Sequence, residues 1–165
     1  VLAESLCIGD TPSVTHASHV SFHFYGTRLP HWRLDGATYF VTWRLHRTHG
    51  PLTHSERAAV LCVLRRFDRP RYRLRALVVM DDHVHVVVRP SIHDSLEGIV
   101  QGWKTFSARR LCAAGRVAPL WQRGYHDRII RSASDLAEKV NYVRLNPVRR
   151  WPGLAEYPWV WIPDE

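Results

Sequence analysis

Residues 73–89 read RLRALVVMDDHVHVVVR, and this stretch decides the fold. Two runs rich in valine and leucine, 73–80 and 83–89, have the composition of β-strands. Only two aspartates separate them, so the connection is a tight turn and the two strands must be antiparallel neighbours. Pro90 ends the second strand, because proline cannot donate a hydrogen bond to a sheet.

Patterns on both sides of this hairpin predict the remaining elements. Apolar residues at helical spacing indicate helices, and β-branched and aromatic residues in rough alternation indicate strands. Besides the hairpin, the expected elements are a strand at 38–45, a helix at 55–67, a helix at 95–114, a strand within 120–131 and a last helix at 132–145. We expect the last helix to open with the capping residue Ser132. It should end before Pro147, because proline disfavours helical conformation at the residue before it.

This order predicts an α+β fold with a ferredoxin-like split βαβ antiparallel sheet, helices on one face and an extra C-terminal helix. Residues 1–27 show no clean period, and we expect them to form a poorly ordered N-terminal extension. Residues 28–165 should form one domain, whose Pro- and Trp-rich tail, 151–165, packs over the edge of the sheet.

The charge balance favours an anionic partner. The 165 residues include 23 Lys and Arg against 15 Asp and Glu, which gives a net charge of +8 and a pI of about 10.0. Nearly all of the positive charge is arginine, whose planar fork binds phosphate oxygens in pairs. The seven tryptophans offer surfaces on which unpaired bases could stack. These features predict a nucleic-acid partner, although most tryptophans could equally be core and most arginines solvated.

The cysteine usage and the hydropathy indicate the cellular compartment. The chain has three cysteines, an odd number, and no Cys-x-x-Cys spacing, which argues against a disulfide framework and a thiolate zinc site. A reducing, cytoplasmic setting fits this usage best. No apolar run approaches the ~20 residues that a membrane helix needs, so we expect no membrane partner.

The pair His83 and His85 is the sharpest chemical feature of the hairpin. Alternate residues of a strand point to the same face, so both imidazoles emerge together while Val84 points into packing. Two imidazoles on a rigid strand make a natural pair of metal ligands, and the alternative is two surface histidines. The neighbouring Asp82 serves either the turn, which we favour, or the orientation of an imidazole.

A second feature lies in the predicted last helix. Tyr142 and Asn146 are four residues apart and therefore share a helix face, and Glu138 lies one turn earlier on the same stripe. A single helical tyrosine is far more often a packing residue than a catalytic one. Its meaning therefore depends on the other motifs of the chain.

Several separated motifs resemble known families. The sequence His83-Val84-His85 resembles the His-hydrophobic-His motif of HUH single-strand endonucleases. The runs 121–131 and 142–149 resemble the REP-associated tyrosine transposases, and residues 29–32, 36–42 and 103–104 fit the same pattern. Because the motifs occur in the right order over residues 29–161, the resemblance covers nearly all of the expected domain.

The resemblance implies a catalytic site and its substrate. Tyr142 would be the single nucleophile, and His83 and His85 would hold a divalent metal, Mg²⁺ or Mn²⁺. Asn146 would be the third ligand from the tyrosine helix, with Glu138 as the alternative. The implied substrate is single-stranded or hairpin-forming DNA, cut and rejoined through a 5′-phosphotyrosine link. Tyr125 is a rival nucleophile, which the family pattern disfavours.

Phosphate contacts need cations. The basic residues that we expect to contact DNA are Lys104, Arg109, Arg110, Arg123, Arg128 and Arg131.

The chain departs from the family pattern at two places. Asp81 stands where the family often has proline, which could loosen the turn before His83. Arg150 and Trp151 replace the small residue and glycine that often follow the Asn-Pro-Val-Arg run, which changes the exit of the last helix. Both histidines and Tyr142 are retained.

Other functions stay open at this point. The runner-up is a DNA-binding protein of the same descent that no longer cuts, acting as a repressor or an architectural factor. A hydrolytic nuclease that uses water is a weaker reading, and RNA is an open substrate. Relatives act as dimers with shared sites or as monomers, so monomer and homodimer are both open. We expect the protein in the bacterial cytoplasm, associated with the nucleoid.

Overall fold

The structure, a computed structural model, describes residues 22–25 and 31–163. Its main sheet has five strands in the order β6-β3-β5-β4-β7, and each neighbouring pair is antiparallel. The elements are β1 (Phe22–Tyr25), β2 (His31–Leu34), β3 (Thr38–Arg44), α1 (His54–Arg65), β4 (Tyr72–Val79), β5 (His83–Pro90), α2 (Leu96–Ala113), β6 (His126–Ile130), α3 (Ala133–Arg150) and β7 (Val160–Trp161).

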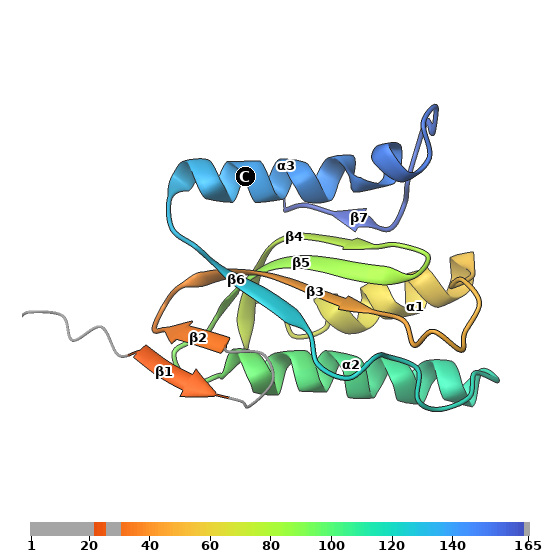
Figure 1. Cartoon of the computed structure of the whole chain (residues 1–165), viewed down its shortest axis with the longest axis horizontal. Coiled ribbons are helices and arrows are strands. Elements are labelled where there is room, and N and C mark those ends of the chain that lie inside the picture. The colour runs from red at the N-terminus through yellow and green to blue at the C-terminus, as the bar shows by residue number, and fades with distance from the viewer. Residues whose placement is uncertain (1–21, 26–30, 164–165) are drawn as a thin grey trace, which may run out of the picture.

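The predicted fold class is confirmed. Strand β5 lies between β3 and β4, so α1 connects two parallel strands that are separated by a third, which is the split βαβ arrangement. Helices α1 and α2 cover one face of the sheet, and α3 lies along the other (Figure 1). The extra C-terminal helix therefore has a sheet face to itself.

The predicted N-terminal extension, 1–27, is only partly covered by the described residues. Within it, residues 22–25 form β1, which pairs with β2 in a separate two-stranded sheet. Residues 1–21 and 26–27 lie outside the described part of the chain. The boundary between residues 27 and 28 therefore stays a prediction.

The larger core lies between the sheet and helices α1 and α2. Trp43 on β3 stacks on Trp103 of α2 with ring centroids 5.9 Å apart. The helical spacing of the apolar residues within 95–114 predicts that Phe106 is buried together with Trp103. This prediction is wrong, because the Phe106 side chain is 51% exposed. Ser107 takes the buried position, because its hydroxyl donates to the Trp103 carbonyl at 2.6 Å and accepts from the Trp121 indole at 2.9 Å.

Strand β5 carries side chains into both cores. Val84, Val86 and Val88 are buried in the α1 and α2 core, whereas Val87 is buried beneath α3. A strand covered on both faces should be apolar almost throughout. His85 is the buried polar exception, at 7% exposed, and it lies on the α3 face as the alternation predicts.

Helix α3 extends beyond its predicted end near residue 145 and runs through Pro147. A proline inside a helix removes one backbone hydrogen bond and crowds the carbonyl four residues earlier, at a cost of about 3 kcal/mol. The helix continues because Val143, Asn146 and Pro147 are all buried, so packing offsets the local penalty. The additional turn contains Arg149 and Arg150. The predicted capping by Ser132 is confirmed, because its hydroxyl accepts from the Asp135 amide at 3.1 Å.

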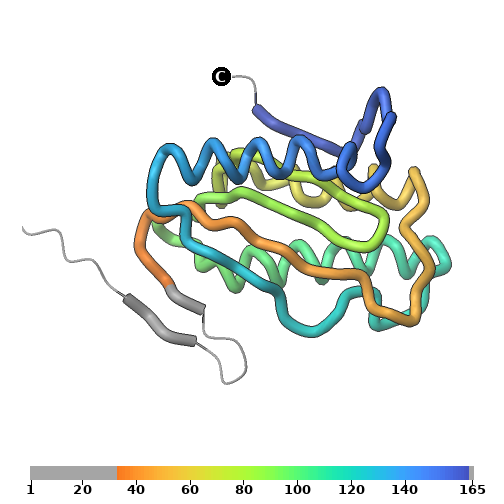
Figure 2. The backbone as a smooth tube through the Cα atoms, turned by 45° about the horizontal axis from the view of Figure 1, so that its top comes forward, coloured from red at the N-terminus to blue at the C-terminus, as the bar shows by residue number. Residues whose placement is uncertain are grey.

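The tail after α3 turns back to the edge of the sheet, as Figure 2 shows. Strand β7 pairs with β4, with Val160 opposite Val78, which confirms the predicted packing of the tail. Among the described residues, no helix has the length and apolar character needed to cross a membrane.

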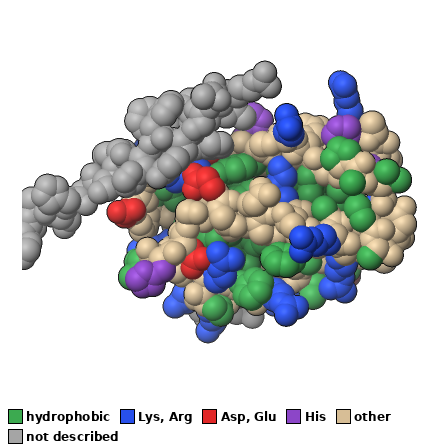
Figure 3. Space-filling view, turned by 90° about the horizontal axis from the view of Figure 1, so that it is seen from below, with side chains coloured by type: hydrophobic (Ala, Val, Ile, Leu, Met, Phe, Trp, Pro, Cys, Tyr) green, Lys and Arg blue, Asp and Glu red, His purple; other side chains and the backbone are tan. Residues whose placement is uncertain are grey.

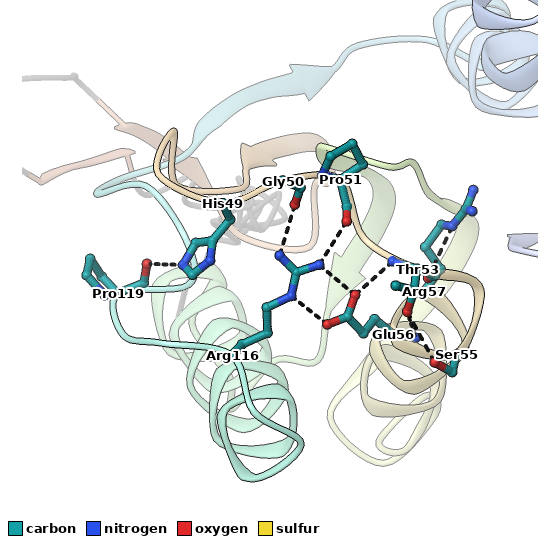
Figure 4. Close-up of polar contacts among 9 residues, drawn as sticks. All are labelled: His49, Gly50, Pro51, Thr53, Ser55, Glu56, Arg57, Arg116 and Pro119. Carbon is teal, nitrogen blue, oxygen red and sulfur yellow. Dashed lines mark hydrogen bonds and ion pairs between the residues drawn. The ribbon is translucent and has the colours of Figure 1, made fainter.

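An ion pair fixes the loop that leads into α1 (Figure 4). Arg116 donates to both carboxylate oxygens of Glu56, at 2.6 and 2.7 Å, and to the carbonyls of Gly50 and Pro51. The next residue, Leu52, donates its amide to the Asp81 carbonyl at 2.7 Å. The loop held by this clamp therefore supports the turn between β4 and β5.

The clamp predicts a specific loss of stability in acid. The Arg116 hydrogen bonds lower the pKa of Glu56 from 4.5 to about 2. The stabilisation is fully present above pH 4.5 and should be lost as the pH falls towards 2. Glu56→Gln should lower the free energy of unfolding by about 1–3 kcal/mol at pH 7, measured by urea denaturation. This difference from the parent should shrink between pH 4.5 and 2.

The exposed Glu156 offers a matched control, because Glu156→Gln should change stability by less than about 0.5 kcal/mol. An unfolding difference for Glu56→Gln that does not depend on pH would contradict the role of this ion pair.

Candidate active site

Three side chains predicted from separate motifs meet on the α3 face of the sheet. The ring centroids of His83 and His85, on β5, are 4.6 Å apart. The ring of Tyr142, on α3, lies 5.3 Å from that of His85 in an edge-on arrangement. The strand and the helix thus bring the predicted metal ligands and the predicted nucleophile together within one chain.

Each imidazole is oriented by a hydrogen bond to its Nδ1 atom. In His83 this atom lies 2.5 Å from a carboxylate oxygen of Asp82, and in His85 it lies 2.7 Å from the Thr42 hydroxyl. Such contacts fix the tautomer and the ring plane of a metal-binding histidine. They leave Nε2 as the nitrogen able to bind a cation. Of the two roles open to Asp82, the side chain takes the orienting one that we had favoured less.

Burial favours the neutral form of the His85 imidazole. Burial, together with the nearby charges of His83 and Arg44, lowers its pKa to about 3. A histidine binds a metal through a neutral nitrogen. The environment of His85 thus removes the competition from protons that an exposed imidazole would meet.

Tyr142 is half-buried between an aromatic ring and a cation. Phe40 contacts it edge-on, with ring centroids 5.7 Å apart, and also stacks on His85 at 5.3 Å. The guanidinium carbon of Arg149 lies 5.2 Å from the centroid of the tyrosine ring. The phenol ring therefore has an aromatic side chain on one side and a positive charge nearby.

The two candidates for the third ligand differ in their surroundings. Asn146 is 8% exposed and lies one turn after Tyr142. The side chain of Glu138 is 69% exposed, and its carboxylate pairs with Lys139 at 2.5 Å. The part of the chain that the structure describes contains no group of three or more His, Cys, Asp and Glu residues suited to a metal. The third ligand therefore stays a prediction, with Asn146 and Glu138 as its candidates.

The rival nucleophile, Tyr125, lies away from the histidine pair. Its hydroxyl accepts from Arg33 at 2.9 Å, and its ring packs against the α1 and α2 core. Burial raises the pKa of the Tyr125 phenol, which works against its ionisation. Arg33 also binds the carboxylates of Asp127 and Glu97, so the cluster joins β2, β6 and α2.

The structure divides the predicted DNA-contacting residues between two regions. Arg109 and Arg110 are exposed on α2, the side on which Figure 3 shows basic side chains spread around apolar ones. Arg128, on β6, is opposite Phe40 and thus shares the sheet face of the candidate site. Arg131 is exposed between β6 and α3, and Arg123 is exposed in the loop before β6.

Lys104 is differently placed, since its ammonium group donates to the carbonyls of Gln122 and Gly124 at 2.8 and 2.7 Å. These two bonds hold the loop that precedes β6. Burial lowers the pKa of Lys104.

Thr42, Phe40 and Arg149 are the neighbours of the site that the sequence did not single out. The register of β3 against β5 places Thr42 opposite His85, but no pattern in the sequence states that register. Arg149 reaches Tyr142 only because the helix continues through Pro147.

The two departures from the family pattern meet in space. A guanidinium nitrogen of Arg150 lies 3.5 Å from a carboxylate oxygen of Asp81, and Trp151 stacks on Tyr157 of the tail at 5.5 Å. Asp81, in the turn before His83, and Arg150, at the end of α3, thus contact each other.

Two known proteins are similar to this chain in sequence or in fold. A REP-associated tyrosine transposase from Escherichia coli (strain K12) is 26% identical over 120 residues, which cover 70% of this chain and 69% of that protein. A solved structure of a REP-associated tyrosine transposase bound to a REP hairpin has the same fold, with a TM-score of 0.68, 19% identity and 82% of each chain covered.

The match to a family decides the assignment. Residues 37–146, about two thirds of the chain, match the family described as "Transposase IS200 like". The matched segment contains His83, His85, Tyr142 and Asn146. The chain therefore belongs to the IS200-like transposases, a family of enzymes.

Proposed function

We propose that the chain is a metal-dependent single-strand DNA transesterase that cuts and rejoins DNA at repeat or hairpin sequences through a 5′-phosphotyrosine intermediate. One observation carries this proposal: the Tyr142 ring is 5.3 Å from the His85 ring, which is 4.6 Å from the His83 ring. A nucleophile and a metal site can act on the same phosphate only when a rigid scaffold holds them close together.

His83 and His85 would hold the cation, Mg²⁺ or Mn²⁺, through Nε2, with the Asn146 amide as the proposed third ligand. The donor set fits such a site, because both rings are oriented through Nδ1 and the low pKa of His85 keeps this ligand neutral. A bound cation would polarise a phosphate oxygen and stabilise the charge that develops on it. Two or three protein ligands leave room for that oxygen.

Tyr142 would form the covalent intermediate. Its phenolic oxygen attacks the phosphorus, the bond between phosphorus and the 3′-oxygen breaks, and a 5′-phosphotyrosine and a 3′-hydroxyl result. The proton that the tyrosine loses balances the one that the 3′-oxygen gains. Because one phosphodiester replaces another, a 3′-hydroxyl can reverse the step without a nucleotide cofactor. The Arg149 guanidinium, 5.2 Å from the centroid of the Tyr142 ring, would attract the phosphate to the tyrosine.

Single-stranded or hairpin DNA is the proposed substrate. The related solved protein is bound to a REP hairpin, and the net charge of +8 favours a polyanion. The exposed arginines proposed to contact phosphates are Arg109, Arg110, Arg123, Arg128 and Arg131. Lys104 would act on the DNA indirectly, by holding the loop before β6. Since one chain supplies every residue of the proposed site, a monomer would suffice.

Tyr142→Phe tests the mechanism directly. With labelled hairpin DNA and Mn²⁺, the parent should give a protein-linked band on a denaturing gel, and the variant should give none, because it lacks the attacking oxygen. Tyr125→Phe is the matched control and should still form the adduct.

Each other result points to a different function. Equal cleavage by the parent and Tyr142→Phe would indicate water as the nucleophile, and DNA binding without any adduct would indicate a non-cutting binder. Cleavage of an RNA hairpin of the same sequence would assign a different substrate.

The histidine pair predicts that the reaction requires a metal. Chelation with EDTA should abolish the adduct, and excess Mn²⁺ should restore it. His85→Ala should lose both the adduct and the binding of Mn²⁺ in calorimetry, because a ligand is removed. His93→Ala, an exposed histidine beyond the end of β5, should change neither. An adduct that forms undiminished in EDTA would exclude this metal site.

Thr42→Val tests whether the orientation of His85 matters. The change removes the hydroxyl at 2.7 Å from Nδ1 while keeping the shape of the side chain. Loss of such an orienting partner should weaken Mn²⁺ binding or the rate of adduct formation by about 10- to 100-fold. Thr48→Val removes a similar threonine–histidine contact, to His46, which is not one of the proposed ligands, and should have no effect. Identical behaviour of the two variants would refute the orienting role.

A further inference from the structure

The helix that carries Tyr142 is attached to the sheet by the smaller of the two cores. Beneath α3 the buried cluster of the described chain consists of Ala76, Val78, Met80, Val87 and Val143, of which Val143 belongs to the helix, and Leu136 and Val140 of the helix are partly buried against it. Apolar contacts are non-directional. They hold α3 against the sheet but determine its position along the strands less sharply than polar contacts do.

A polar contact ties the end of this helix to the turn that precedes His83. Arg150, the last residue of α3, places a guanidinium nitrogen 3.5 Å from a carboxylate oxygen of Asp81. The next residue of the turn, Asp82, binds Nδ1 of His83 at 2.5 Å. Asp81 thus contacts the helix that carries Tyr142, and the adjacent Asp82 contacts His83, a ligand of the proposed metal site.

The surroundings of Asp81 make this ion pair more than a surface contact. Ion pairs between exposed side chains stabilise little, but the Asp81 side chain is only 13% exposed. Its other carboxylate oxygen is buried and has no hydrogen-bond partner among the residues that the structure describes. The Arg150 side chain is itself 56% exposed, but its displacement would leave the largely buried Asp81 carboxylate without this cation, which is unfavourable.

The tail reinforces the same connection. Trp151 stacks on Tyr157 with an interplanar angle of 24°. The Tyr157 hydroxyl donates to the Val79 carbonyl at 2.8 Å, just before the turn, and accepts from Arg57 of α1 at 3.0 Å. The C-terminal end of α3 is therefore joined to the turn between β4 and β5 by two independent routes.

We propose that the Asp81–Arg150 ion pair is a positioning contact that fixes α3 relative to β5 and so sets the approach of Tyr142 to the histidine pair. This inference rests on the proposed function. Tyr142 lies about two helical turns before Arg150, so a shift of the helix end along the sheet moves the phenol with it. A misplacement of about 1 Å can slow a reaction about 100-fold.

A double-mutant cycle tests the contact. The variants are Asp81→Asn, Arg150→Met and their combination, with Arg150→Lys to keep the charge. Arg144→Met is the matched control, since it removes an exposed arginine of the same helix that contacts only Asn141 among the described hydrogen bonds. The measurements are the rate of adduct formation at saturating hairpin DNA, the affinity for that DNA, and amide hydrogen exchange of α3.

Each single variant should slow adduct formation by about 10- to 100-fold with unchanged DNA affinity. The double variant should be no slower than either single one, because both remove the same contact. Arg150→Lys should recover most of the rate, and Arg144→Met should match the parent. The proposal would be overturned if Arg150→Met slowed adduct formation and weakened DNA binding while Asp81→Asn changed neither the rate nor the affinity. Arg150 would then be a phosphate contact.

Hydrogen exchange separates this inference from the proposed function. If the parent forms no adduct, the proposed function fails, and the exchange of the last two turns of α3 alone decides on the ion pair. Faster exchange in both single variants, without further increase in the double variant, would support the contact. Exchange equal to that of Arg144→Met would overturn it.

Discussion

The antiparallel pairing of β5 with β3 and β4 is the constraint on which the rest of the structure depends. Because β5 is central, its valines are buried in both layers, and a strand of that kind leaves little room for a polar side chain. His85 can occupy such a position only because Thr42, across the β3 register, binds its Nδ1 atom. The register that pairs β3 with β5 in the sheet therefore also gives His85 its hydrogen-bond partner in the site.

The two faces of the sheet have different roles. The layer of α1 and α2 contains the tryptophan stacks and the buried hydroxyl network, and it supplies most of the apolar burial. The α3 layer has a small core and gathers the histidines, the tyrosine and two arginines. The site therefore lies on a sheet whose opposite face is covered by the larger core. The loop held by Arg116 and Glu56 contacts the turn between β4 and β5 through the Leu52 amide.

Pro147 shows how strongly the site depends on packing. A local rule would end α3 before this proline, and the last turn would then be lost. In the structure the helix passes through it, since the residues on its inner face are buried, and that turn carries Arg149 to Tyr142 and Arg150 to Asp81. A position that looks like a helix terminator thus supplies much of the polar environment of the site.

The sequence alone predicted four strands of the main sheet (β3, β4, β5 and β6), the three helices, the hairpin and the position of His83 and His85 on one face, but not β1, β2 or β7. It could do so because strand and helix periods are local properties of the chain. The motifs that resemble a transposase family also pointed to Tyr142 and Asn146.

Only the tertiary structure decided what surrounds these residues. The contact of Thr42 with His85, 43 residues away along the chain, follows from the register between β3 and β5, and the placement of Arg150 against Asp81 follows from the packing of α3. The exposure of Phe106 and the continuation of the helix through Pro147 had the same origin. Local patterns state which face a side chain occupies, but long-range packing decides its partner, because contacts between distant segments depend on how whole elements fit together.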